Sequence, residues 1–116
     1  MSERTITRLD DKILCLLDGG AIGELEYDER PGRTYECHLD VVSVYQRQGV
    51  GRAMMTELEG MAKVRKGMSL YSFCAGDNAS ALAFFEACGF RSRFMHDFYG
   101  QGRHAYFLWK PIGRPE

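Results

Sequence analysis

The chain has 116 residues with ordinary apolar content, enough for one folded domain with a single hydrophobic core. Its net charge of −1 argues against a general nucleic-acid-binding protein, which would be strongly basic. No stretch approaches the roughly 18 apolar residues of a membrane span, and the polar N-terminus is unlike a signal peptide. We therefore expect a cytoplasmic domain over 1–116, without nucleic-acid or membrane partners, with frayed residues at 1–11 and 111–116.

The cysteines show neither CxxC spacing nor a histidine at metal-ligand spacing, so we expect no structural zinc and no other metal site. Each one falls inside an expected strand or helix, which is typical of small apolar residues in a reduced core. The four residues are Cys15, Cys37, Cys74 and Cys88.

The first half of the chain predicts three antiparallel strands. Residues 12–17 and 21–28 flank an Asp-Gly-Gly turn, which is typical of a β-hairpin. A second turn, Arg-Pro-Gly-Arg, leads into a longer strand at 34–44. The strands therefore precede the first helix of the chain.

The third strand runs into a basic, glycine-containing turn that continues directly as an amphipathic helix. Gly49 and Gly51 permit unusual backbone dihedrals and a close approach to a bulky ligand. The free amides and macrodipole of the helix N-terminus attract anions, so this turn predicts a phosphate site. No Lys-Ser or Lys-Thr pair follows, which excludes a Walker loop, and Met54 replaces the third glycine of a dinucleotide fingerprint. An ordinary glycine turn with solvated arginines is the alternative.

The second half predicts a helix from residue 50 that ends at Gly67, a strand at 69–74 and a helix at 78–88. Asp77 or Asn78 can cap the second helix. A terminal hairpin is then formed by the expected strands at 90–98 and 104–110. The resulting order is βββαβαββ, and its strand, helix, strand crossover requires parallel pairing of the strands that begin at 34 and 69.

Two segments resemble signatures of the GCN5-related N-acetyltransferase (GNAT) family. Residues 46–51 fit the family's pyrophosphate-binding pattern [Gln/Arg]-x-x-Gly-x-[Gly/Ala], and DNASALAFFEACGF at 77–90 is similar to its second signature. The resemblance covers about residues 12–110. It implies an α/β (α+β) fold with a mixed, mostly antiparallel sheet, in which the parallel strand pair splays apart to admit the pantetheine arm of the cofactor.

The resemblance also implies the function: an N-acetyltransferase, which moves an acetyl group from acetyl-CoA to a primary amine by direct attack in a ternary complex. A non-catalytic acyl-CoA-binding module is the alternative. Phe85 favours this alternative, because family members commonly carry at that position a tyrosine thought to protonate the departing thiolate. A backbone N–H near Val42 is the expected oxyanion donor.

By resemblance, the cofactor contacts fall into three groups: strand backbone beside the pantetheine, the loop around the pyrophosphate, and two positions of the second signature. These residues are Val41, Val42, Ser43, Gln46, Arg47, Gln48, Gly49, Val50, Gly51, Arg52, Asn78 and Phe85.

Glu36 and His38 are the candidate general bases, because a carboxylate or an imidazole can accept a proton near neutral pH. Side chains alternate along a strand, so these two share one face with Asp40, while Tyr35 and Cys37 share the other. Alignment with the family places Tyr35 or Cys37 at the usual position of the base. Polar residues on the solvent face of a sheet are the alternative interpretation of Glu36 and His38.

The family usually has one or two helices that wall the acceptor pocket ahead of the segment that matches here, so we expect an open acceptor side. Either a second subunit completes the wall as a homodimer, or the acceptor is a large molecule such as a protein amine. A small-molecule amine is the other class of acceptor.

Overall fold

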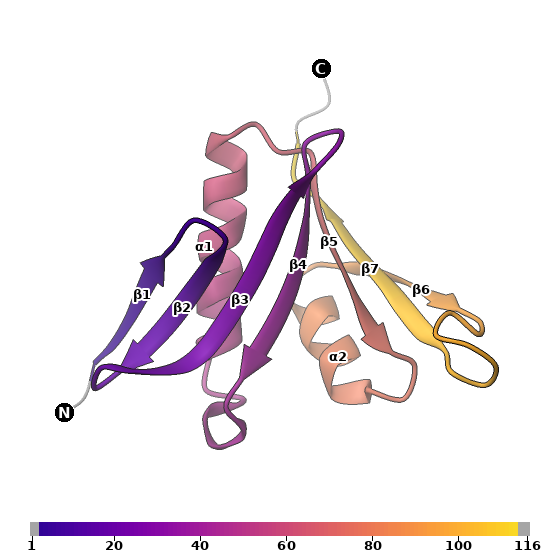
Figure 1. The fold of residues 1–116 in the computed structure, drawn as a ribbon, viewed down its shortest axis with the longest axis horizontal. Helices are drawn as coiled ribbons and strands as arrows, with labels where there is room; N and C mark the ends of the chain where they lie inside the picture. Colours follow the sequence, from indigo (N-terminus) through magenta and orange to yellow (C-terminus); the bar gives the residue numbers. More distant parts are fainter. Residues whose placement is uncertain (1–2, 114–116) are drawn as a thin grey trace.

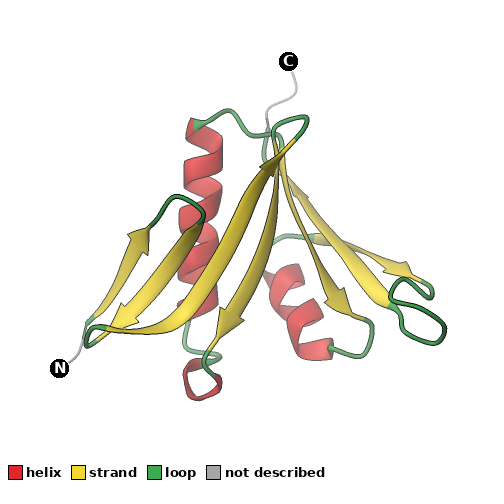
Figure 2. Ribbon diagram, viewed as in Figure 1, coloured by secondary structure: helices red, strands yellow, loops and turns green. Residues whose placement is uncertain are grey.

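The computed structural model describes residues 3–113, which form one sheet and two helices (Figures 1 and 2). The elements in chain order are β1 (Arg4–Arg8), β2 (Lys12–Leu17), β3 (Gly20–Arg30), β4 (Thr34–Val41), the 3-10 turn η1 (Ser43–Tyr45), α1 (Val50–Val64), β5 (Ser69–Ala75), α2 (Ala79–Ala87), β6 (Arg91–Met95) and β7 (Ala105–Pro111). The sheet order is β1-β2-β3-β4-β5-β7-β6. Every neighbouring pair is antiparallel except β4 and β5, which confirms the expected mixed sheet.

The ends of the chain are more ordered than the sequence predicts. Residues 1–11 were expected to fray, which is wrong for Arg4–Arg8, because β1 pairs with β2 along its whole length. Its three consecutive β-branched residues, Thr5 to Thr7, suit a strand, although the stretch is short and polar. Beyond β7, the amides of Ile112 and Gly113 donate to the carbonyl of Met68, so fraying is also wrong for 111–113. Residues 1–2 and 114–116 lie outside the described part.

The expected element order is found from β2 onward, preceded by the additional strand β1. The third expected strand is shorter than 34–44. It ends at Val41, because the amides of Tyr45 and Gln46 turn back to the carbonyls of Val42 and Ser43 in η1. All four cysteines are free thiols, and all but the half-buried Cys88 are buried.

Both helices cover the same face of the sheet (Figure 1). Met54, Leu58 and Ala62 of α1 are fully buried in the main core. Lys110 of β7 donates to the Cys88 carbonyl at the end of α2 and pairs with Glu59 of α1, which places the two helices on one side. Within residues 3–113, no helix covers the opposite face. Neither α1 nor α2 has the length and apolar character needed to cross a membrane.

The parallel pair β4–β5 opens into a V. The two strands pair only from Thr34 with Ser69 to Glu36 with Tyr71, yet β4 continues to Val41 and β5 to Ala75. Figure 2 shows the two strands diverging beyond the paired ends. The splay that the family resemblance implies is therefore present, and it leaves the facing edges of both strands unpaired with each other.

Candidate functional site

The loop between η1 and α1 presents free backbone amides. Gly49 is the N-cap of α1 with a φ of 82°, and no side chain caps the helix there. Arg47 also has a positive φ, 63°. An uncapped helix N-terminus carries unpaired N–H groups and partial positive charge, which suits an anion. Within residues 3–113, the backbone N–H groups of Gly49, Val50, Gly51 and Arg52 have no hydrogen-bond acceptor.

The two glycines of this loop have different roles. A Cβ at Gly49 would find only Arg4 at 4.0 Å, so the requirement there is the left-handed dihedral and not space. A Cβ at Gly51 would lie 3.0 Å from the Phe84 ring and 3.1 Å from Leu39. The close approach predicted at Gly51 is therefore to the protein's own α2 and β4, which hold the start of α1 in place.

Polar side chains brace the loop against its neighbours. Gln46 Nε2 donates to the Val41 carbonyl at 3.1 Å, and Gln48 Nε2 donates to the Val44 carbonyl at 3.0 Å. Arg4 Nη1 of β1 donates to the Gln48 carbonyl at 2.7 Å. Sequence reasoning missed Arg4, because it placed this residue in a frayed terminus.

The two arginines of the loop differ in availability. Arg52 Nη2 donates to the Ala87 carbonyl at 2.8 Å, where the negative end of α2 favours a cation. The Arg47 side chain is exposed and forms no hydrogen bond or salt bridge within residues 3–113. Arg47 is thus the loop cation that remains available to an anionic ligand.

The open edge of β4 supplies further backbone donors. Val42 donates its N–H to the Ile22 carbonyl at 2.9 Å, so the oxyanion donor expected near Val42 cannot be that amide. Because hydrogen-bonding direction alternates along an antiparallel strand, the N–H groups of Leu39 and Val41 point to the other edge, into the splay. An oxyanion donor near Val42 therefore stays a prediction, with the amide of the adjacent Val41 as the one that is available.

Glu36 is the last residue of β4 that pairs with β5, and three polar side chains contact its carboxylate. Arg30 Nη2 donates to Oε1 at 3.0 Å, Tyr71 donates its hydroxyl to Oε1 at 3.4 Å, and His38 Nε2 lies 3.1 Å from Oε2. Burial would raise the pKa of Glu36, but hydrogen bonds from Arg30 and His38 outweigh it and hold the pKa below its usual range. Burial, with the Glu36 charge, raises the pKa of Tyr71. The Glu36 carboxylate is therefore ionised at neutral pH, and it is a weak base.

Tyr35 and Cys37 lie on the opposite, helix-covered face, as the alternation predicts. The Tyr35 hydroxyl donates to Glu29 Oε1 at 2.7 Å, and burial together with Glu29 raises its pKa. Burial raises the pKa of Cys37 to about 12, and its thiol faces the Tyr71 carbonyl at 3.5 Å. A protonated, buried group is a poor proton acceptor at neutral pH, so the family alignment does not identify the base here.

Helix α2 is fixed by its predicted caps. Of the two predicted capping residues, Asn78 is the one that caps, because its Oδ1 accepts the Ala81 amide at 3.0 Å. At the other end, Gly89 has a φ of 90°, and the Phe90 amide donates to the Phe85 carbonyl at 3.0 Å. Phe85 is buried, with its ring edge-to-face against Phe90 at 5.0 Å, and it offers no proton donor.

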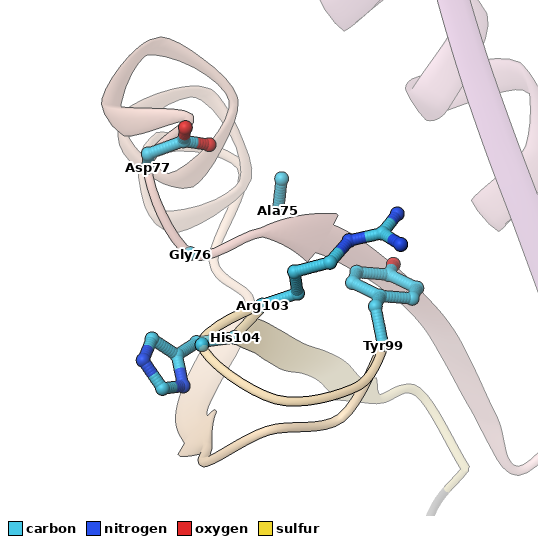
Figure 3. A pocket seen from close by; sticks show the side chains of 7 residues that line it. Ala75, Gly76, Asp77, Tyr99, Arg103 and His104 are labelled. Carbon is cyan, nitrogen blue, oxygen red and sulfur yellow. The ribbon is translucent and has the colours of Figure 1, made fainter.

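A cavity of about 490 Å³ lies at the carboxyl end of β5, next to the β6–β7 loop (Figure 3). In Figure 3, Arg103 extends toward Tyr99, and Asp77 lies on the far side at the start of α2. The cavity is distinct from the glycine loop. The sequence did not reveal it, because its walls come from two segments that are distant in the chain: residues 75–77 and the β6–β7 loop.

The β6–β7 loop is fastened by a group of polar side chains that the sequence did not bring together. Asp97 donates its amide to His104 Nδ1 at 2.9 Å and accepts the Gly102 amide at 2.7 Å. His96 stacks on His104 with ring centres 4.4 Å apart. Although His96, Asp97 and His104 place three metal-ligating atoms within 4.8 Å, the Nδ1 lone pair of His104 is already engaged in the loop. We interpret the group as structural.

A comparison with protein families gives a match over residues 6–90 to the acetyltransferase (GNAT) family model. No match is found among curated protein sequences.

Many solved structures share the fold. A GNAT-family protein from Desulfovibrio desulfuricans is 22% identical, with a TM-score of 0.81 over 88% of this chain and 68% of that one. The ribosomal-protein-S18-alanine N-acetyltransferase of Escherichia coli is 20% identical, with a TM-score of 0.78 over 94% and 74%. The protein yncA of Salmonella typhimurium, solved with its cofactor acetyl-CoA, is 16% identical, with a TM-score of 0.79 over 90% and 66%.

Proposed function

Because the chain belongs to the GNAT family of acetyltransferases, we propose that it transfers the acetyl group of acetyl-CoA to a primary amine by direct attack in a ternary complex. The observation that carries this proposal is the glycine loop, whose free amides follow directly on the strand that bounds the splay. Backbone donors at a helix N-terminus fit a diphosphate, and an unpaired strand edge fits the amides of a pantetheine arm.

The cofactor contacts follow from that arrangement. The amides of the loop and the side chain of Arg47 bind the diphosphate, while Val41 and Ser43 border the pantetheine, with Asn78 and Phe85 of the second signature nearby. When bound, acetyl-CoA would supply an activated thioester: the amine nitrogen would form the amide bond, the carbonyl–sulfur bond would break, and CoA would leave as the thiolate while the proton of the amine passes to the general base. One N–H group of this strand edge, that of Leu39 or Val41, stabilises the oxygen that becomes negative during this exchange.

His38 is the general base of the proposed reaction, and Glu36 positions it. With Nε2 donating to the ionised Glu36 carboxylate, the neutral imidazole keeps a lone pair on Nδ1 that can take the proton of the amine, directly or through one water. His38 is 57% exposed on the uncovered face, where an acceptor can approach it. Arg30 and Tyr71 hold the Glu36 carboxylate in its place.

The proposal places the reaction in the cytoplasm, which the four free thiols support, because that compartment keeps cysteines reduced. The acceptor is a small-molecule or protein amine, and a homodimer remains a prediction of the sequence.

Two measurements on the full chain test the function. Calorimetry with acetyl-CoA measures binding, and chromatographic detection of free CoA with a panel of amines, peptides and polyamines measures turnover. We expect binding together with turnover of at least one amine. Binding without any turnover would favour the acyl-CoA-binding module, for which the buried Phe85 argues. Absence of both would overturn the proposal.

A further inference from the structure

The face of the sheet that carries Glu36 and His38 is covered by no helix within residues 3–113. The strand registers place one continuous row of side chains across it, from Asp28 of β3 through Glu36 and Tyr71 to Trp109 of β7. Residues directly opposite each other on paired strands lie on the same face. The row therefore joins two chemically different halves at the apex of the splay.

The β3–β4 half of this face is acidic. Its carboxylates are Glu24, Glu26, Asp28, Glu36 and Asp40. In the register, Glu24 lies opposite Asp40, Asp28 lies opposite Glu36, and Glu26 lies opposite His38.

Two cations form salt bridges with these carboxylates, and they leave two of the carboxylates without a salt bridge. Lys12 pairs with Glu24 at 2.9 Å, and Arg30 pairs with Glu36 at 3.0 Å. Glu26 and Asp40 have no salt bridge within residues 3–113. Glu26 of β3 lies directly opposite His38, and Asp40 lies two residues beyond His38 on β4, so both carboxylates flank the proposed base. Glu26 also lies directly opposite Lys12 of β2, whose ammonium group already pairs with Glu24.

The β5–β7 half of the face is aromatic. Phe107 lies 5.9 Å from Tyr71, 5.3 Å from Phe73 and 5.4 Å from Trp109, measured between ring centres. Phe98 of the β6–β7 loop stacks on Phe73 at 5.0 Å and is 45% exposed. Ring faces next to carboxylates attract ammonium and guanidinium groups through cation–π and ionic contacts together.

Resting on the proposed function, we infer that this face selects a basic peptide segment as acceptor, whose amine meets His38 and whose other cationic side chains lie along Glu26 and Asp40. Small ligands prefer concave pockets, whereas an uncovered sheet face fits an extended chain. Glu26 and Asp40, which form no salt bridge within residues 3–113, give charge complementarity to arginine and lysine, and the aromatic half packs the aliphatic stems of these cations. Arg91 and Arg93 face the same side from the edge strand β6, which confines the negative charge to the β3–β4 half.

The test uses two peptides of equal length, each with a free α-amine and no lysine. At two positions after the first residue, one peptide carries arginine and the other carries glutamine. Trp109 is the only tryptophan of the chain and lies on this face, so its fluorescence reports peptide binding without turnover. We expect a KM and a fluorescence-derived Kd about tenfold lower for the arginine peptide, and a difference that shrinks in high salt because exposed charges are screened.

The variant Glu26→Gln/Asp40→Asn removes the two carboxylate charges beside His38 and should reduce the preference between the peptides about fivefold. Glu86→Gln is the matched control, because Glu86 is exposed on α2, on the other side of the sheet.

Equal affinity for both peptides, or a strong preference for spermidine over the arginine peptide, would overturn the inference while acetyl transfer stands. A stable dimer that buries Trp109 would also overturn it. Fluorescence selectivity without turnover of any amine would support this face as a binding surface and count against the proposed function.

Discussion

The glycine loop and the Glu36 cluster differ in the groups that they present: backbone amides in the loop and side chains in the cluster. The loop presents backbone amides whose directions are set by the dihedrals of a few consecutive residues, Arg47 to Gly51. The cluster presents side chains from three strands: Arg30 of β3, Glu36 and His38 of β4, and Tyr71 of β5. A backbone site is encoded locally, whereas a side-chain site depends on the register of the whole sheet.

This difference separates cofactor binding from catalysis. A change in the cluster should alter turnover and leave the cofactor bound, while a change in the loop should weaken the cofactor first. Substitutions that disrupt either the loop or the cluster therefore test whether the two parts are independent.

The largest effect is expected from His38→Gln, which removes the imidazole and keeps a polar side chain on the uncovered face. Loss of a general base lowers kcat by roughly 10²- to 10⁴-fold. Steady-state kinetics measures kcat, and calorimetry should find the Kd for acetyl-CoA unchanged. Glu36→Gln should have a smaller effect, because Glu36 positions the ring. A large loss of kcat in Glu36→Gln with none in His38→Gln would show that Glu36 is the general base and that His38 only positions it.

The next effect tests the loop with Gly49→Val. The left-handed dihedral costs about 1–2 kcal/mol for a residue with a Cβ, so the loop shifts and acetyl-CoA affinity should fall about tenfold. Gly32→Val is the matched control, because Gly32 has a φ of 83° against 82° at Gly49, and its added Cβ meets nothing within 4 Å. Both variants should lose stability in thermal melts, but only Gly49→Val should lose affinity. Equal affinities would show that the loop does not hold the cofactor.

A third prediction concerns Glu59, a carboxylate on the helix-covered face that lies between Lys110 at 2.6 Å and Lys63 at 3.2 Å. Burial would raise the pKa of Glu59, but hydrogen bonds from Lys110 and Lys63 outweigh it and lower the pKa below its usual 4.5. A lowered folded-state pKa stabilises the protein above the unfolded-state value, and that contribution is lost as the pH falls through the folded-state pKa.

Glu59→Gln should therefore lower the free energy of unfolding by about 1 kcal/mol at pH 7 and by progressively less below pH 4.5. Urea unfolding at several pH values measures this loss. Unlike Glu36, Glu59 faces away from the proposed acceptor side, so kcat should stay the same. A constant loss at every pH would mean that the two lysines do not act through the charge of Glu59.

The sequence predicted what depends on neighbouring residues. The loop, the Asn78 cap and the turn at Gly89 each follow from a few consecutive residues, and the crossover rule then required β4 and β5 to be parallel. Glu36 and His38 were placed correctly on one face, because side chains alternate along a strand.

What the sequence did not predict depends on contacts between distant segments. Arg30 and Tyr71 reach Glu36 only through the strand registers, and Arg4 reaches the loop only because β1 pairs with β2. The sequence also does not tell toward which neighbouring strand the Val42 amide points. Its hydrogen bond to the Ile22 carbonyl shows that it points toward β3. These features follow from tertiary pairing, which local propensity does not encode.

The smallest effect compares two glycines of α1. At Gly60, which is exposed, an added Cβ meets nothing within 4 Å, so Gly60→Ala should raise the free energy of unfolding by about 0.5–1 kcal/mol through helix propensity. At Gly51, the same methyl group would press on Phe84 at 3.0 Å and Leu39 at 3.1 Å, so Gly51→Ala should destabilise the protein. Thermal unfolding and acetyl-CoA titration measure both. Because only Gly51 fixes the start of α1 against β4 and α2, only its variant should also weaken the cofactor, and equal gains in stability would show that this contact does not constrain the loop.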